Sequence, residues 1–259
     1  MTQPPPMAPA LPVLTGAQSR AAVPAPDQFR PLTTERPHMP DSAIPALLQS
    51  YLEELVPDRP RELRAMEAMA EAEGFPIIGP ACGQVCYLVA RMIRARRIFE
   101  LGSGFGYSTA WFARAVKENA DVSEREHHVG EVHHTVWDQA LSDQAQRHLS
   151  KLGLAELVRF HCNEAVQSLR EVGGHFDLIF SDIDKEGYPD SLPVIEQHLR
   201  PGGLLIVDNM LWGNRIFDPT DRDAATEGVR RFTRMVASSD RWIGSILPIR
   251  DGLLLAMRR

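Results

Sequence analysis

Near the middle of the chain the sequence reads Ile98-Phe99-Glu100-Leu101-Gly102-Ser103-Gly104-Phe105-Gly106-Tyr107-Ser108. A short apolar run that breaks into closely spaced glycines is typical of a strand, a tight turn and the start of a helix. Glycines let such a turn bend sharply and approach a ligand. In open α/β sheets that ligand lies at the carboxyl ends of the strands. The alternative is a glycine-rich turn that binds nothing.

The spacing of these glycines favours one kind of ligand. Dinucleotide-binding turns follow the pattern G-x-G-x-x-G, but Gly102, Gly104 and Gly106 follow G-x-G-x-G, and Tyr107 stands where the third glycine belongs. Glu100 ends the preceding strand, where a carboxylate repels a pyrophosphate and attracts a sulfonium or ammonium group. The turn therefore predicts S-adenosylmethionine rather than NAD.

Short apolar segments alternate with helical segments on either side of this turn. The predicted strands are Arg97–Leu101, Glu131–Trp137, Leu157–His161, Phe176–Ser181 and Leu204–Val207. The predicted helices between them are Tyr107–Lys117, Ala140–Leu152, Ala165–Val172 and Tyr188–Leu199. This alternation predicts an α/β fold with a mostly parallel sheet and helices on both faces.

Both ends of this region depart from the alternation. Three helices are predicted before it, from Asp41 or Ser42 to Leu55, over Pro60–Glu73 and over Gly83–Arg94. After it come a helix at Ala224–Ala237 and two strands, Trp242–Leu247 and Leu253–Met257, joined by a turn at Arg250-Asp251-Gly252. A hairpin of this kind predicts that the sheet ends in an antiparallel pair.

Two segments differ in composition from the rest. Eleven of the twenty prolines fall within the first 45 residues, and such a density opposes helix and sheet alike. We expect a disordered extension over residues 1–40, with a docking tail as the alternative, and one domain over residues 41–259. The polar and charged segment Lys117–Gly130 is interpreted as an inserted surface loop.

The bulk composition restricts the class of protein. The 259 residues are 44% hydrophobic with a net charge of −6, which is typical of a globular protein and unlike a nucleic-acid binder. Three cysteines are too few for a disulfide framework. No apolar run is long enough to span a membrane, and no secretion signal is recognised. We expect a cytoplasmic protein that binds neither nucleic acid nor membrane.

An acid after the second predicted strand suggests a nucleotide contact. Nucleotide-binding folds commonly hold the ribose hydroxyls with a carboxylate at this place, and Asp138 is the acid nearest to it. The competing interpretation is that Asp138 caps the following helix, and one residue can do both.

Oxygen-bearing side chains also follow two further predicted strands. Asp182 follows the strand that ends at Ser181, and Asp208 and Asn209 follow the strand that ends at Val207. In a parallel sheet these residues converge at the edge that carries the glycine turn. Hard oxygen ligands suit Mg²⁺, Mn²⁺ or Ca²⁺. The alternative is that the acids only cap helices and line a wet loop.

Lys185 lies three residues after Asp182. Near a bound dication its ammonium form is disfavoured, so its amine becomes able to accept a proton from a substrate hydroxyl. Without a metal site, the alternative interpretation is an ordinary surface lysine.

Four segments together resemble the cation-dependent O-methyltransferases, the family of the catechol and caffeoyl-CoA O-methyltransferases. They are Glu100–Ser108, Phe176–Tyr188, Arg200–Gly213 and Leu247–Leu253. The resemblance extends from about residue 42 to the end. It implies a seven-stranded Rossmann-like sheet with an antiparallel last strand, S-adenosylmethionine as cofactor, a small aromatic hydroxyl substrate and a homodimer.

The resemblance also assigns roles to individual residues. It implies a divalent metal held by Asp182, Asp208 and Asn209, a catalytic base at Lys185 and an aromatic substrate wall at Tyr188 and Trp212. It implies cofactor contacts at Ile78, Glu100, Gly102, Ser108, Glu164 and Ala165. We expect Gly104, Asp138 and Asp182 to complete the set of cofactor-binding residues.

The sequence departs from the family pattern in two places. The usual ribose-binding acid falls at Val136, so Asp138 has to replace it or the contact is lost. Asn163-Glu164 stands where the family has a glycine-aspartate pair, which puts the adenine contact in doubt.

The predicted reaction is methyl transfer to a catechol-like hydroxyl. Two other classes stay open: a metal-independent small-molecule methyltransferase, and a non-catalytic protein that binds S-adenosylmethionine.

Overall fold

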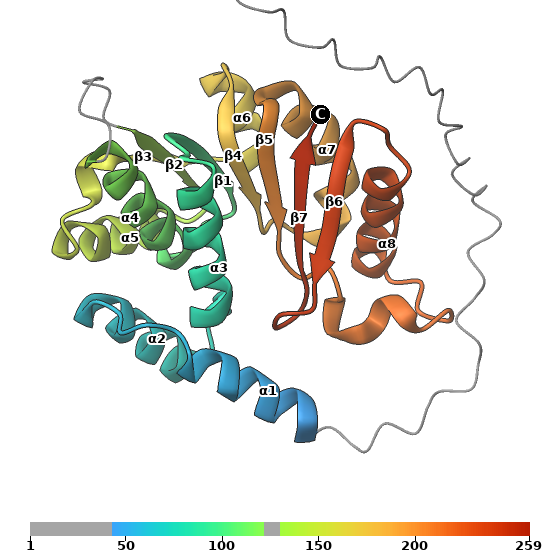
Figure 1. Ribbon diagram of the computed structural model, residues 1–259, viewed down its shortest axis with the longest axis horizontal. Helices are drawn as coiled ribbons and strands as arrows, with labels where there is room; N and C mark the ends of the chain where they lie inside the picture. Colours follow the sequence, from blue (N-terminus) through green and yellow to red (C-terminus); the bar gives the residue numbers. More distant parts are fainter. Residues whose placement is uncertain (1–42, 122–129) are drawn as a thin grey trace, which may run out of the picture. The chain divides into compact units, whose positions relative to one another are not determined.

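A seven-stranded sheet with strand order β3-β2-β1-β4-β5-β7-β6 runs through the protein (Figure 1). The computed structural model describes residues 43–121 and 130–259. The strands are β1 Arg97–Leu101, β2 Glu131–Val136, β3 Val158–Cys162, β4 Phe176–Ser181, β5 Leu199–Val207, β6 Trp242–Leu247 and β7 Leu253–Arg258. The helices are α1 Ala43–Glu54, α2 Arg61–Glu73, α3 Gly79–Met92, α4 Tyr107–Asp121, α5 Gln139–Lys151, α6 Ala165–Val172, α7 Tyr188–His198 and α8 Ala224–Ala237, with 3-10 turns η2 Ala155–Leu157, η3 Lys185–Gly187 and η4 Trp212–Phe217.

The strand pairing confirms the predicted fold. The strands β1 to β5 pair in parallel. The strand β7 lies antiparallel between β5 and β6, with Leu205 opposite Ala256 and Gly244 opposite the same residue. The carboxyl ends of the parallel strands therefore share one edge of the sheet, and the turn between β6 and β7 reaches that edge.

The core has two layers because successive strand residues face opposite sides of the sheet. In β1, Ile98 packs with residues of α2, α3, α4 and α5, whereas Phe99 packs with residues of α6, α7 and α8. In β4, Leu178 packs in the same layer as Ile98, and Ile179 packs in the same layer as Phe99. Both faces of the sheet are covered, as the alternation of strands and helices predicts.

Two predicted boundaries are wrong for identifiable reasons. Gly83 was predicted to start a helix but lies inside α3, where an added Cβ would stand 2.3 Å from Nε1 of Trp111. This glycine lets α3 pack closely against α4. The strand β5 begins at Leu199 rather than Leu204, because Leu199 pairs with Phe176 before the register shifts. The intervening Pro201-Gly202-Gly203 obscures this part of the strand in the sequence.

The predicted insertion begins later than expected. Helix α4 continues through Lys117 to Asp121, so the first part of the predicted loop is helical. Residues 122–129 and the predicted extension over residues 1–40 lie outside the described residues. No helix in the described part of the chain is long and apolar enough to cross a membrane.

Candidate active site

A cavity of about 760 Å³ lies at the carboxyl edge of the parallel strands. Its wall is built from the segments that follow β1 to β5, together with Phe75–Ile78 before α3 and Arg250 from the turn between β6 and β7. The cavity lies where open α/β sheets bind ligands, and where the sequence predicts it.

The glycine turn is held tightly against the neighbouring strand. Gly102 has a φ of +84°, and a Cβ there would stand 2.6 Å from the carbonyl oxygen of Asp182. The turn is anchored on the other side by β2, because the amide of Ser103 donates to the carbonyl of Thr135 at 2.9 Å. A side chain at position 102 would push the turn away from Asp182, so the glycine is required by its contacts.

Glu100 lies buried beneath this turn. Its Oε2 accepts a hydrogen bond from the hydroxyl of Thr109, and its Oε1 is buried without a partner. Burial raises the pKa of Glu100 to about 7, although hydrogen bonds from Ser108, Thr109 and Ser103 act in the opposite direction. Glu100 is fully buried and is not among the residues that line the cavity, so its contact with a cationic cofactor stays a prediction.

Most of the predicted cofactor residues line the cavity. They are Ile78, Gly102, Gly104, Ser108, Glu164, Ala165 and Asp182. The carboxylate of Glu164 also caps α6, with Oε1 accepting from the amide of Val166 at 2.9 Å. Thr135 and Val136, at the end of β2, and Trp137, just after it, line the neighbouring part of the wall.

Asp138 is not among the residues that line the cavity. Its carboxylate caps α5, where Oδ1 accepts hydrogen bonds from the amides of Ala140 at 2.6 Å and Leu141 at 3.2 Å. The capping role weighed for this residue is therefore present. Its contact with a ribose stays a prediction.

Asp182 and Lys185 form an ion pair at the cavity. The Nζ of Lys185 donates to Oδ1 of Asp182 at 2.7 Å and to the carbonyl of Ile183 at 3.2 Å. Both side chains line the cavity. The pair therefore lies in the wall of the same cavity as the glycine turn.

Asp208 lies just behind this pair and is only 1% exposed. Its Oδ2 accepts a hydrogen bond from Nη1 of Arg250 at 2.9 Å, while its Oδ1 is buried without a partner. Burial raises the pKa of Asp208 to about 6, and the charge of Asp182 adds to this effect. The amide of Asp208 donates to the carbonyl of Ser181 at 3.1 Å, which places Asp208 beside the start of the segment that carries Asp182.

The side-chain amide of Asn209 is held by a residue of the turn between β6 and β7. The backbone of Asn209 is left-handed, with a φ of +57°, a conformation that asparagine tolerates better than most residues. Its Nδ2 donates to Oδ2 of Asp251 at 3.1 Å, which leaves the amide oxygen as the group available to a ligand in the cavity.

The predicted metal ligands fit a divalent cation in their chemistry. Asp182 and Asp208 supply carboxylates, Asn209 supplies an amide oxygen, and the buried Oδ1 of Asp208 lacks a partner. Oxygen ligands of this kind suit Mg²⁺ and Ca²⁺. Within residues 43–121 and 130–259, no group of three or more His, Cys, Asp or Glu is arranged to hold a metal; the predicted set contains only two such residues.

The two predicted substrate-wall aromatics occupy different environments. Trp212 lines the cavity, and the Nζ of Lys185 lies 5.7 Å from the centroid of its ring. Tyr188 is fully buried, and its hydroxyl donates to the carbonyl of Asp208 at 2.9 Å. The structure does not place Tyr188 where a substrate can touch it, so this assignment is corrected: Tyr188 is a core residue that supports the segment after β5.

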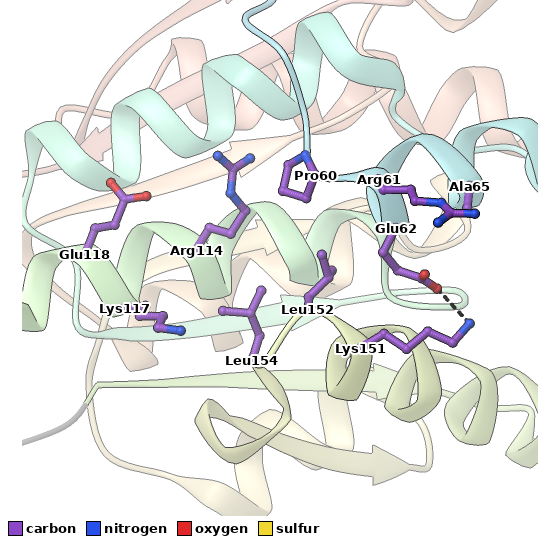
Figure 2. Close-up of a pocket in the computed structure, with 10 residues that line it drawn as sticks. All are labelled: Pro60, Arg61, Glu62, Ala65, Arg114, Lys117, Glu118, Lys151, Leu152 and Leu154. Carbon is purple, nitrogen blue, oxygen red and sulfur yellow. Dashed lines mark hydrogen bonds and ion pairs between the residues drawn. The ribbon is translucent and has the colours of Figure 1, made fainter.

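A second cavity, of about 640 Å³, lies between α2, α4 and the residues that follow α5 (Figure 2). Its carboxylates are engaged in ion pairs: Glu62 accepts from Lys151 at 3.0 Å, as the dashed line in Figure 2 shows, and Glu118 pairs with Arg91. None of the predicted site residues lines it. The chemistry that the sequence predicts therefore belongs to the first cavity.

Sequence reasoning missed three residues of this site. Arg250 and Asp251 were interpreted as parts of a hairpin turn and of a segment that resembles the family, but neither was given a role in the site. Thr109, which bonds Glu100, follows Ser108 directly in the cofactor motif. The contacts of Arg250 and Asp251 join residues 42 positions apart, and a local pattern does not reveal them.

Comparison with known proteins gives consistent results. A family model described as O-methyltransferase matches residues 51–259. The chain is 31% identical over 206 residues to a catechol O-methyltransferase from Niastella koreensis, a match that covers 75% of this chain and 88% of that protein.

Solved structures of similar proteins share the fold. The O-methyltransferase TomG from Streptomyces achromogenes, which is involved in tomaymycin synthesis and was solved in complex with SAM, superposes with a TM-score of 0.71 at 27% identity, over 82% of this chain and 96% of that one. An O-methyltransferase from Bacillus cereus in complex with SAH gives a TM-score of 0.71 at 24% identity, over 82% of this chain and 97% of that one.

Proposed function

The chain belongs to the O-methyltransferase family, and from this premise we propose that it methylates one hydroxyl of a catechol-like, vicinal dihydroxy aromatic substrate. The methyl donor is S-adenosylmethionine, and a divalent cation assists the reaction. Mg²⁺ is the first candidate for this cation, and Mn²⁺ and Ca²⁺ are the alternatives. The named activity of the Niastella koreensis relative and the SAM in the TomG structure support this proposal.

One observation carries the proposal. Gly102 packs so closely against Asp182 that the glycine turn and the pair formed by Asp182 and Lys185 border the same cavity. A donor bound at the turn and an acceptor bound at the pair would therefore meet inside one enclosure. Holding two reactants in this way is a large part of the catalysis of a transfer reaction.

The residues around the glycine turn would bind the donor. The carboxylate of Glu100 attracts its positive charge, and the backbone of Gly102 and Gly104 leaves room for a close approach. Glu164 and Ala165 line the cavity after β3, where the family resemblance implies the adenine contact.

The residues after β4 and β5 would bind and activate the acceptor. A divalent cation bound at Asp182, Asp208 and Asn209 would supply Lewis acidity and a template for two neighbouring oxygens. The amine form of Lys185 removes the proton from the acceptor hydroxyl. The resulting oxygen forms a bond with the methyl carbon while the bond between carbon and sulfur breaks, and Trp212 supplies an apolar wall.

A metal-independent methyltransferase is the second candidate. The observation that favours it is that Lys185 and Arg250 each bond one of the two carboxylates. The two cations partly balance the charges that a metal would otherwise neutralise.

The test is methyl transfer from S-adenosylmethionine to a panel of catechols and caffeoyl esters, with Mg²⁺ or with EDTA. The variants are Asp182→Ala, Lys185→Ala and, as a control, Asp143→Ala, which changes an exposed acid that bonds Gln139. The proposal expects activity that needs the metal, Asp182 and Lys185 but not Asp143. Activity that is indifferent to EDTA and to Asp182→Ala would favour the second candidate.

We also propose a homodimer and a catalytic domain over residues 41–259. Helix α1 supports the dimer because several of its large apolar side chains are exposed: Leu47, Leu48 and Tyr51, with Leu55 just after the helix. Exposed apolar patches of this kind often mark a protein interface.

A further inference from the structure

The turn between β6 and β7 is fixed in place against the segment that follows β5. The amide of Met210 donates to the carbonyl of Gly252 at 2.9 Å, and the amide of Leu211 donates to the carbonyl of Asp251 at 2.8 Å. A Cβ at Gly252 would stand 2.9 Å from the backbone nitrogen of Leu211. The position of Arg250 is therefore set by the backbone contacts of the two residues that follow it.

Arg250 has an unusual backbone for a residue with a side chain. Its φ is +50°, a left-handed conformation that costs a non-glycine residue free energy and tends to occur at functional sites. From this position its guanidinium donates to Oδ2 of Asp208 at 2.9 Å. Arg250 also lines the cavity, whereas Asp208 does not.

The contact matters because Asp208 is almost completely buried and its other oxygen has no partner. A buried carboxylate is unfavourable unless a positive charge or hydrogen bonds compensate for it. Arg250 supplies a permanent positive charge, since arginine does not lose its proton in proteins. Asp208 is thus compensated before any metal arrives.

We propose that Arg250 competes with the divalent cation at Asp208 and thereby sets the affinity of the metal site. This inference rests on the proposed function, because it takes Asp208 as a metal ligand. Two positive charges that share one carboxylate repel each other. The guanidinium therefore weakens metal binding in the free enzyme, and the oxygens of the acceptor are needed as additional ligands for tight binding.

The charges around Arg250 are consistent with this role. Asp182 is bonded to Lys185, and Asp251 is bonded to Asn209 and to the amide of Gly213 at 2.7 Å. Oδ2 of Asp208 is the carboxylate oxygen that holds Arg250. Removal of the guanidinium charge should therefore change the charge balance of Asp208 more than that of the other two acids.

The test measures Mn²⁺ binding directly, by the loss of the electron paramagnetic resonance signal of free Mn²⁺, without cofactor or acceptor. The Arg250→Gln variant should bind Mn²⁺ about tenfold or more tightly than the wild type, because it removes the repulsion between two positive charges on one carboxylate. Arg250→Lys keeps the charge and should stay near the wild type. Arg241→Gln removes an exposed arginine that pairs with Glu196 and serves as the control.

Equal or weaker Mn²⁺ binding by Arg250→Gln would overturn the inference while leaving the proposed function intact. If neither protein binds Mn²⁺, or if Asp182→Asn binds it as well as the wild type, the proposed metal site fails as well. Arg250→Gln leaves a buried carboxylate unpaired, so it should melt at a lower temperature in EDTA and recover with Mn²⁺. A variant that is unstable in EDTA and is not rescued by Mn²⁺ would also contradict the inference.

Discussion

Asp251 fixes the orientation of the Asn209 amide across 42 positions of sequence. Its Oδ2 accepts from Nδ2 of Asn209 at 3.1 Å, and its Oδ1 accepts from the amide of Gly213 at 2.7 Å. One carboxylate thus determines which end of the Asn209 side chain is left for a ligand. It also ties the segment around Trp212 to the turn between β6 and β7.

This relationship predicts that Asp251 supports metal binding without touching the metal. Asp251→Ala should weaken Mn²⁺ binding by about tenfold or more, as expected for a residue that orients a ligand. Asp251→Asn can still accept from Gly213, so it should lose less affinity. Equal affinity in all three proteins, measured by Mn²⁺ titration, would show that the amide of Asn209 needs no such support.

The buried acid beneath the turn predicts opposite pH effects on stability and on cofactor binding. The pKa of Glu100 is raised from 4.5 to about 7 by burial, so the folded protein keeps a proton that the unfolded chain releases. The stability of the cofactor-free protein should therefore fall as the pH rises from about 5 to 8. Affinity for the cationic cofactor should rise over the same range, because the carboxylate becomes charged.

Glu100→Gln tests both effects. It should flatten the pH dependence of cofactor affinity, measured by calorimetry. Part of the slope in thermal stability should remain, because burial also raises the pKa of Asp208, to about 6. Cofactor affinity that keeps its pH dependence in Glu100→Gln would assign that dependence to another group.

A comparison of two glycines separates the free-energy cost of steric contact from that of backbone strain. Gly102 and Gly153 both have positive φ, but a Cβ at Gly102 meets the Asp182 carbonyl at 2.6 Å, whereas a Cβ at Gly153 has nothing within 4 Å. Gly153→Ala should cost about 1 kcal/mol from its backbone alone. Gly102→Ala should cost more and should also weaken cofactor binding. Equal losses in chemical denaturation would mean that the turn relaxes.

Substitutions of Tyr188 and of Trp212 should have different effects, because Tyr188 is a core residue and Trp212 lines the cavity. Tyr188→Phe removes one buried hydrogen bond, and should lower the free energy of unfolding by about 1 kcal/mol without changing the KM for the acceptor. Trp212→Ala should raise that KM, because its ring lines the cavity. Steady-state kinetics and denaturation of both variants check the assignment, and a raised KM in Tyr188→Phe alone would reverse it.

The exposed apolar side chains of α1 predict the effect of adding charge. Leu47 is 69% exposed and Tyr51 is 58% exposed, so replacing Leu47 with Glu costs the monomer little. In a dimer that buries this surface, Leu47→Glu should shift the molar mass seen by light scattering towards the monomer. Met257→Glu, which changes an exposed residue of β7, is the control. A wild type that is monomeric at all concentrations would contradict the dimer.

The sequence alone determined the fold class and much of the site, because these depend on local patterns. Alternating apolar residues place Ile98 and Phe99 on opposite faces wherever their strand lies, and the glycine spacing at 102–106 defines the turn. Parallel pairing then brings the residues after β1, β4 and β5 to one edge. For this reason the local patterns alone place Asp182 and Lys185 at the same edge as Gly102.

Only the tertiary structure decided how the charges around these residues are compensated. The contacts of Arg250 with Asp208, and of Asp251 with Asn209, depend on the antiparallel register of β7 against β5 and on a turn that packs against the backbone. Tyr188 is buried because α7 packs against α8, with the Tyr188 and Phe232 rings 5.5 Å apart. Such long-range packing selects the partner of each polar group, and a single sequence does not encode it in any local pattern.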